Sequence, residues 1–463
     1  MERNQQVIGY LPDERPPIWK LLLYAIQQVI VMFPATVAVA IITGFHISTT
    51  IFASGLATIC FILVTGRKIP LYYGSSFSYI AAIASLMSSE ALAGYSLNEK
   101  IAVAQFGIIM SGFVSILAGL IVNRFGRDSL EKILPASVTG PIAMVIGLTL
   151  AGTALNDAAS IAIDTAGTIA VSESQVALAK NMAWIVSLVT LISSVLFSVY
   201  LKGFMGQIPL ILGPILGCIT AFIIKLVTGI DLFKVLPETA NTGIFALPIF
   251  TLPKPSWMAV AAIMPIAIAT IPESTAHIYQ LDLYINDLAS KKGNGKRYNI
   301  ADKLGLNLIG DGIGDIVAGL VGGPAGTNYG ENISAMAITK VFSISVLIGA
   351  SIIAMIIACF TPLINAIYSI PTAVIGGIEI YLFGAIAVQG VAIMVEKKVD
   401  LFSARTIAVI ATIMIIGLGG QYAFGGNIPF FGIEVPSVAG AAIFGILLNL
   451  VLSIGEKKKG DVK

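Results

Sequence analysis

Long apolar runs separated by short polar breaks dominate the chain from residue 18 to residue 454. Runs such as 101–122 and 342–360 show no alternation of apolar and polar positions, which the strands of a transmembrane barrel would require. Each is long enough for a helix that crosses a bilayer, which takes ~20 residues. The pattern predicts an all-α polytopic membrane protein with fourteen segments, at residues 18–44, 48–66, 71–89, 100–123, 133–155, 182–201, 208–229, 257–281, 301–321, 326–340, 341–367, 370–395, 405–420 and 435–454.

Composition supports a membrane protein, and charge position gives it an orientation. Of 463 residues, 57% are hydrophobic and 11% charged, against about 25% charged in a soluble domain. If the N-terminus is cytoplasmic, the fourteen segments leave only five of the 27 Lys and Arg residues on the opposite side: Lys100, Lys180, Lys225, Lys234 and Lys254. Because basic residues stay on the cytoplasmic side, we expect a cell-membrane protein with both termini cytoplasmic.

Reactive side chains are few. The three cysteines, Cys60, Cys218 and Cys359, each lie inside an apolar run and are expected to be small packing residues, not disulfide or metal ligands. The two histidines fall in different regions without a nucleophile–base arrangement, which argues against an enzyme. The near balance of 27 basic and 25 acidic residues gives no indication of a nucleic-acid surface. No metal site or cofactor is expected.

Two of the fourteen segments are poor spans. Residues 73–78 (Tyr-Gly-Ser-Ser-Phe-Ser) and 329–334 (Tyr-Gly-Glu-Asn-Ile-Ser) carry polar, glycine-bearing sequence into the membrane and share Tyr-Gly at the start and Ser five residues after the Tyr. Polar backbone at membrane depth is tolerated where it lines a cavity, so we expect half-helices preceded by extended chain. The pair 135–140 and 371–376 repeats the offset of seven segments. Seven is odd, so the sequence predicts two inverted repeats.

Broken helices in inverted halves indicate a transporter site near the membrane midplane. Where a helix begins inside the membrane, its first amides have no intrahelical partner and can donate to a substrate. Two carboxyls fall beside these breaks: Glu273 within segment eight and Glu331 at the start of segment ten. An intramembrane acid is a functional hypothesis, with a structural hydrogen-bonding carboxyl as the alternative. His277 follows Glu273 on the same helical face, whether as a partner of that carboxyl or as a packed histidine.

Three further acids and their neighbours are less readily explained. Asp311 and Asp315 lie among Gly310, Gly312 and Gly314, glycines that resemble close-packing positions. Glu379 lies within segment twelve with no evident partner. The sequence assigns no role to these three acids.

The string from Asn328 to Lys340 resembles the signature of the nucleobase-cation symporter 2 family, also called the nucleobase-ascorbate transporters. With Glu331 at its head it is most similar to the bacterial uracil permeases, and residues 70–77 and the pair Glu273 and His277 extend the resemblance over the chain. It implies a core domain of segments one to four and eight to eleven and a gate domain of the others, often dimeric through the gate. The corresponding ranges are 1–125 and 255–368 for the core, 126–235 and 369–455 for the gate, and 456–463 for a cytoplasmic tail.

The resemblance also implies roles for individual residues. Glu273 and Glu331 would bind the base together with the backbone at Phe77 and Gly330, while the Phe77 ring and Tyr329 line the pocket. Glu273, with His277, would carry the coupled proton. Supporting roles are expected for Gln28, Ser76, Asn332 and Thr339. The chain departs from common family residues at four places: Gln27-Gln28 for Gln-His, Ser334 for Gly, Gly326 for Asn and Ser274 for His.

The function that follows is secondary active import of a nucleobase, uracil in the first instance, by proton symport with alternating access. Uracil alternates N–H donors and C=O acceptors around a flat ring, which suits carboxylates and helix-terminal amides. The alternatives left open are a xanthine or urate permease of the same family, coupling to Na⁺ in place of H⁺, an anion transporter of similar fold and, more distantly, a membrane enzyme.

Overall fold

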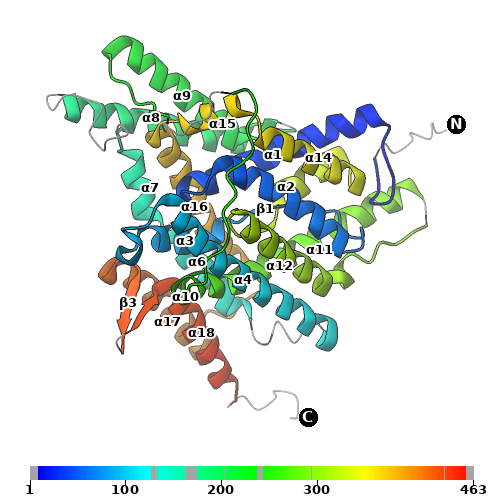
Figure 1. Cartoon of the computed structure of the whole chain (residues 1–463). Helices are drawn as coiled ribbons and strands as arrows, with labels where there is room; N and C mark the ends of the chain where they lie inside the picture. The colour runs from blue at the N-terminus through cyan, green and yellow to red at the C-terminus, as the bar shows by residue number, and fades with distance from the viewer. Residues whose placement is uncertain are drawn as a thin grey trace.

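The computed structural model describes residues 9–126, 132, 134–161, 175–203, 205–236, 243–293, 295–431 and 433–454. The chain is 75% helical, and its helices pack side by side, with α12 against α2 and α4 and with α16 in a separate group (Figure 1). The longer helices are α1 (Ile18–Thr43), α2 (Ile47–Val64), α4 (Leu97–Phe125), α6 (Ala136–Thr149), α8 (Val176–Tyr200), α9 (Pro209–Thr228), α11 (Ala267–Lys292), α12 (Leu304–Val321), α14 (Ile344–Ala358), α16 (Thr372–Glu396), α17 (Ala404–Phe424) and α18 (Ser437–Ile454).

Shorter elements complete the described fold. The short helices are η1 (Phe77–Tyr79), α3 (Ile80–Ser88), η2 (Glu90–Leu92), α7 (Ala151–Ala158), η4 (Met205–Gln207), α10 (Trp257–Ile263), η5 (Met264–Ile266), η6 (Ala301–Lys303), α13 (Gly330–Thr339) and α15 (Thr361–Tyr368). The strands are β1 (Tyr73–Ser75), β2 (Gly326–Asn328), β3 (Asn427–Phe430) and β4 (Ile433–Pro436).

Eleven helical stretches within the described ranges are long and apolar enough to cross a membrane. Each coincides with one of the fourteen predicted segments, and the remaining three segments, 71–89, 326–340 and 341–367, contain shorter helices. The chain is therefore an all-α polytopic membrane protein. The predicted tail, 456–463, lies outside the described residues.

Several predicted boundaries were wrong. The segment predicted to end at 281 continues as α11 to Lys292, because its last three turns are amphipathic and end the continuous apolar run without ending the helix. The segment 133–155 divides at Leu150 into α6 and α7, and 341–367 divides at Phe360, where Pro362 opens α15. The hairpin of β3 and β4 was not predicted.

The two broken segments lie side by side. β1 pairs antiparallel with β2, so that Gly74 faces Thr327, and each strand leads into a short helix, η1 followed by α3 in one case and α13 in the other. The extended chain expected before each short helix is thus observed. Because the strands satisfy each other's backbone groups, this non-helical chain is stable inside the helical bundle.

Small residues permit the closest helix packing. A side chain at Gly112 would collide with the backbone of Gly312, and one at Gly312 with the backbone of Gly112, so α4 and α12 are in backbone contact there. Gly310 lies against the Phe61 ring and Gly314 against the Tyr73 ring. The expectation that glycines 310, 312 and 314 are close-packing positions is confirmed.

Candidate functional site

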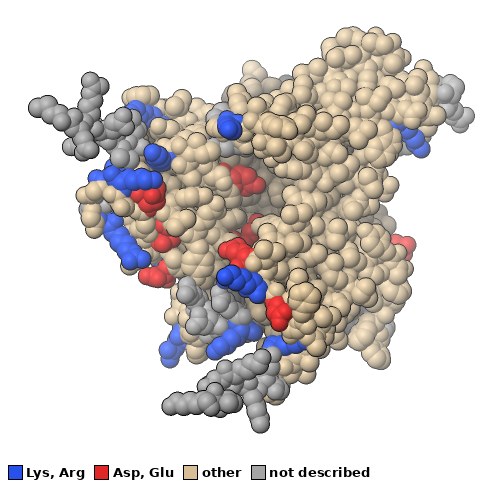
Figure 2. Space-filling view, turned by 180° about the vertical axis from the view of Figure 1, so that it is seen from behind, with Lys and Arg blue, Asp and Glu red and all other residues tan. Residues whose placement is uncertain are grey.

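A cavity of about 560 Å³ opens between the paired broken segments and α16. One wall comes from α1, β1, η1, α11, β2 and α13, and the other from α16, the first turn of α9 and three residues before it, Leu201, Gly203 and Gly206. Figure 2 shows a hollow in the middle of the molecule with acidic side chains inside it. Each wall thus combines elements that are far apart in the sequence.

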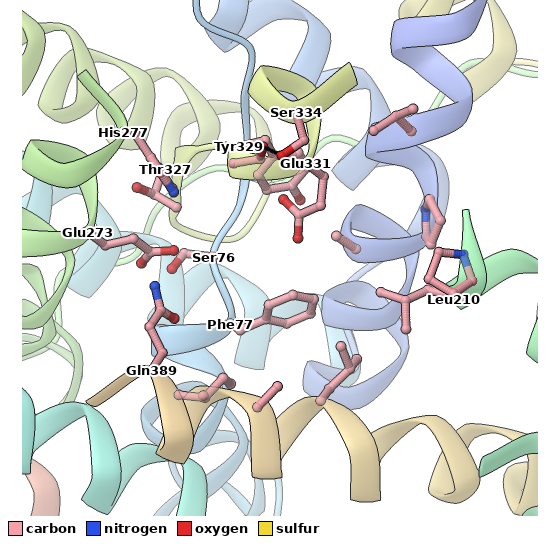
Figure 3. Close-up of a pocket in the computed structure, with 18 of the residues that line it drawn as sticks. Ser76, Phe77, Leu210, Glu273, His277, Thr327, Tyr329, Glu331, Ser334 and Gln389 are labelled. Carbon is pink, nitrogen blue, oxygen red and sulfur yellow. Dashed lines mark hydrogen bonds between the residues drawn. The ribbon is translucent and has the colours of Figure 1, made fainter. Parts of the chain in front are cut away.

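Two carboxylates point into this cavity. Glu273 reaches it from the second turn of α11, and Glu331 from the first turn of α13 (Figure 3). The Phe77 ring lies across the cavity from Glu331, and the amide of Gln389 points toward Glu273 from α16. Acceptor oxygens, an aromatic face and an amide therefore surround one space, as recognition of a flat polar ring requires.

The start of α13 supplies donors. A helix cannot bond its first amides internally, and α13 has no side-chain cap, so the Gly330 amide remains available at the cavity wall. Tyr329 immediately precedes α13, and its hydroxyl donates to the Ser75 carbonyl at 2.9 Å. It is also hydrogen-bonded at 3.0 Å to the Thr36 hydroxyl of α1. Tyr329 thereby joins both broken segments to α1.

A buried polar network holds the broken segments from behind. The Asp315 carboxylate accepts a hydrogen bond from the Tyr73 hydroxyl at 2.5 Å and one from the Gly326 amide at 2.8 Å. The Ser274 hydroxyl donates to Asp311 and accepts from the amide of Asn328 at 3.2 Å. Asp311 and Asp315, to which the sequence assigned no role, therefore connect α12 with α11, β1 and β2.

The structure places most predicted residues at the cavity. Glu273, Glu331, Phe77, Tyr329, Gly330, His277 and Ser76 all line it. Within the described residues no hydrogen bond joins His277 to Glu273, although both line the cavity. The His277 ring instead lies over Gly330, where a methyl group would come within 2.8 Å of its Nε2.

Three predicted supporting residues lie behind the wall. The Asn332 amide donates to the Gln28 side-chain oxygen at 2.7 Å, and both residues are buried. They hold α13 against α1 without lining the cavity. Thr339 is the last residue of α13 and does not line the cavity, and its hydroxyl donates to the Ala335 carbonyl at 2.8 Å.

Sequence reasoning missed six polar residues of the cavity: Tyr381 and Gln389 on α16, Ser75 on β1, Thr327 and Asn328 on β2, and Ser334 on α13. Tyr381 and Gln389 are separated by eight positions, close to two helical turns each of 3.6 residues, and so fall on one face. That spacing in an apolar helix was an available signal. In the ranges that the structure describes, no group of three or more His, Cys, Asp and Glu side chains is arranged to hold a metal ion.

The fold and the cavity define a membrane permease, a transporter and not an enzyme. Residues 19–426 match the model of the Xan_ur_permease permease family. The chain belongs to this family, the nucleobase-cation symporter 2 family.

Relatives match over nearly the whole chain. It is 32% identical to the uracil permease of Bacillus caldolyticus over 447 residues, covering 95% of this chain and 94% of that one. It is 31% identical to the uracil permease of Escherichia coli strain K12 over 443 residues, covering 96% and 93%.

Solved structures share the fold. SLC26A9 superimposes with a TM-score of 0.63 at 12% identity, covering 94% of this chain and 65% of that one. The transmembrane domain of the cyanobacterial bicarbonate transporter BicA has a TM-score of 0.57 at 14% identity, covering 96% and 100%. At these identities the likeness concerns the fold alone.

Proposed function

We propose that this permease imports uracil by proton symport with alternating access. The observation that carries the proposal is the pair of carboxylates, Glu273 and Glu331, that point into one cavity beside the Phe77 ring and the amides that open α13. Uracil N–H groups would donate to the carboxylates, its carbonyl oxygens would accept from the amides, and its ring would lie on Phe77. The uracil permeases among the relatives support this choice of base.

The two acids would have different tasks. Glu331 stands at a helix N-terminus, where partial positive charge favours a carboxylate, and would recognise the base as a permanent acceptor. Glu273 lies in the second turn of α11, beyond the first residues of the helix, and would carry the coupled proton. His277, which lies over Gly330, would influence the proton through the shared cavity and not by a direct bond.

Alternating access would arise from movement between two halves of the molecule. The core would consist of 1–125 and 255–368 and the gate of 126–235 and 369–455, arranged as two inverted repeats of seven segments. In support, α12 packs along α2 and α4, whereas α16 packs along α6, α7 and α8, and the cavity lies between these groups. Cytoplasmic termini, supported by the distribution of Lys and Arg, and a homodimer formed through the gate complete the proposal.

Labelled uracil uptake into proteoliposomes, in sodium-free buffer with an acidic exterior or with equal pH, tests substrate and coupling together. Accumulation only under the proton gradient is the expected result. If labelled uracil is not taken up and labelled xanthine or urate is taken up instead, the protein is a purine permease. Accumulation that requires sodium would overturn the proton as the coupling ion while leaving the binding site intact.

A further inference from the structure

Glu379 is the acid that the transport site leaves unexplained. It lies on α16, is 0% exposed, and does not line the cavity. Neither of its carboxyl oxygens has a hydrogen-bond donor among the described residues. An ionised carboxylate buried without a donor is unfavourable by several kcal/mol, so the side chain needs a proton or a partner.

The nearest candidate partner is a second acid, Asp157, at the C-terminal end of α7. The carboxyl of Asp157 is close enough to that of Glu379 for each to affect the protonation of the other. Gly376, three residues before Glu379 and on the same helical face, makes this approach possible, because a side chain there would collide with the backbone of Asp157 and Ala158. Two carboxylates are both acceptors, so they can bond only when one proton lies between them.

Lys234 balances the charge of the pair. It follows α9, and its backbone amide donates to the Ser369 carbonyl at 3.1 Å, which fixes this segment near the start of α16. Burial lowers the pKa of the Lys234 amine, while the nearby Asp157 and Glu379 act in the opposite direction. One ammonium with two carboxyls is neutral when the acids hold a single proton.

The other elements packed on α16 bring no further charge to the pair. α6 has no ionisable side chain, Lys180 and Tyr200 of α8 are exposed, and Lys225 of α9 forms an ion pair of 2.5 Å with Asp231. Cys218 of α9 lines a second cavity together with Glu379 and is uncharged as a thiol. The protonation of the pair therefore depends on Asp157, Glu379 and Lys234.

We propose that Asp157 and Glu379 share one buried proton and form a proton-dependent tie between α7 and α16 that positions the α16 wall of the cavity. Tyr381 stands two residues after Glu379, and its hydroxyl is 2.9 Å from that of Ser198 on α8. Loss of the proton would leave two carboxylates in contact, and their repulsion would displace α16 from α7. Asp157 and Glu379 are thus positioning residues, distinct from the carboxylates that face the cavity.

Infrared difference spectroscopy of the purified protein in lipid tests the shared proton without any substrate. At neutral pH we expect the carbonyl stretch of a protonated carboxyl to be lost in Glu379→Gln and also in Asp157→Asn, because either amide donates to the remaining carboxylate. Glu396→Gln, an exposed acid on the same helix, is the matched control and should leave the band unchanged. A band that survives both substitutions would overturn the proposal.

Uptake kinetics test the tie itself, a step that rests on the proposed uracil transport. In Glu379→Gln the amide can donate to the Asp157 carboxylate at any pH, because this hydrogen bond needs no titratable proton, and KM should stay within about twofold of the wild-type value. Glu379→Ala removes the hydrogen bond and should raise KM about tenfold. The wild-type KM should rise in alkaline buffer at zero gradient and that of Glu379→Gln should not. Equal defects in the Gln and Ala variants would overturn the tie, whereas absence of uracil uptake in every variant would contradict only the proposed substrate.

Discussion

The Tyr73 hydroxyl donates a 2.5 Å hydrogen bond to the Asp315 carboxylate, which ties the first broken segment to α12. Asp315 also accepts from the Gly326 amide, at the start of β2. One buried carboxylate thus holds both strands at the positions from which their short helices enter the cavity.

Tyr73→Phe should therefore loosen both segments at once. Loss of the donor leaves Asp315 with the Gly326 amide alone, and we expect a loss of stability of about 1 kcal/mol. The midpoint temperature of thermal unfolding in detergent and the affinity for uracil should both fall. Tyr24→Phe is the matched control, since the Tyr24 hydroxyl makes no hydrogen bond in the described part of the chain. Equal stability of the two variants would contradict the role assigned to Asp315.

Gly330 allows the His277 ring to approach the start of α13. A methyl group at this position would come within 2.8 Å of the His277 Nε2, so Gly330→Ala should be destabilising, by about 1–3 kcal/mol. In a double-mutant cycle, the Ala substitution should have little effect once His277→Ala is present. Gly384→Ala on α16, where no atom is within 4 Å, serves as the control. If the losses of stability caused by Gly330→Ala and His277→Ala are additive, the His277 ring is not what prevents a side chain at position 330.

The broken segments were predictable because their polarity conflicts with their depth. Tyr-Gly followed by Ser or Glu within apolar sequence has few physical solutions, and extended chain leading into a short helix is one of them. Glu273 and Glu331 were identified for the same reason, as acids in apolar surroundings. Local sequence was sufficient to predict a site residue wherever a polar or acidic side chain stood out within an apolar membrane segment.

Relationships between distant residues were not predictable. Asn332 bonds Gln28 across 304 positions, and only the packing of α13 on α1 determines that these two amides meet instead of facing the cavity. Gln389 likewise reaches the cavity because α16 packs opposite the broken segments. The extension of α11 to Lys292 was missed because helix continues after the apolar pattern ends.

Glu331→Gln tests recognition of the base. The substitution replaces one acceptor oxygen by a donor and removes the charge, so a hydrogen bond worth about 1.5–3 kcal/mol is lost and uracil affinity should fall about tenfold to a hundredfold. Equilibrium binding by isothermal titration measures the change. An affinity equal to that of the wild-type protein would exclude Glu331 from the binding site.

Glu273→Gln tests proton coupling separately from binding. An amide cannot take up and release the proton, so accumulation driven by the gradient should be abolished, while exchange of labelled for unlabelled uracil at equal pH should persist. Measuring both in the same proteoliposomes distinguishes a coupling defect from a misfolded protein. Accumulation by this variant would require another proton carrier.

Asp13 makes the attachment of the N-terminal segment depend on pH. Its carboxylate is hydrogen-bonded to Lys296 and, at 2.5 Å, to the Tyr298 hydroxyl. Burial alone would raise the pKa of Asp13, but these bonds outweigh burial and hold the pKa below its ordinary value. The folded state therefore favours the ionised form, so the stabilisation is present above the ordinary pKa of Asp and is lost as the pH falls through the lowered value.

Because the Asp13 side chain is half exposed, the effect should be about 0.5 kcal/mol. Hydrogen exchange at the Phe342 amide, which donates to the Tyr10 carbonyl at 2.7 Å, measures the attachment. After correction for the intrinsic exchange rate, its protection should decrease on acidification in the wild-type protein and change less in Asp13→Asn. Asp287→Asn removes a similar exposed pair, with Lys291 at 2.6 Å, that does not touch this segment, and should retain the wild-type dependence. The same acid dependence in Asp13→Asn would assign the titration to another group, with Glu14, paired at 2.6 Å to Lys292, the next to test.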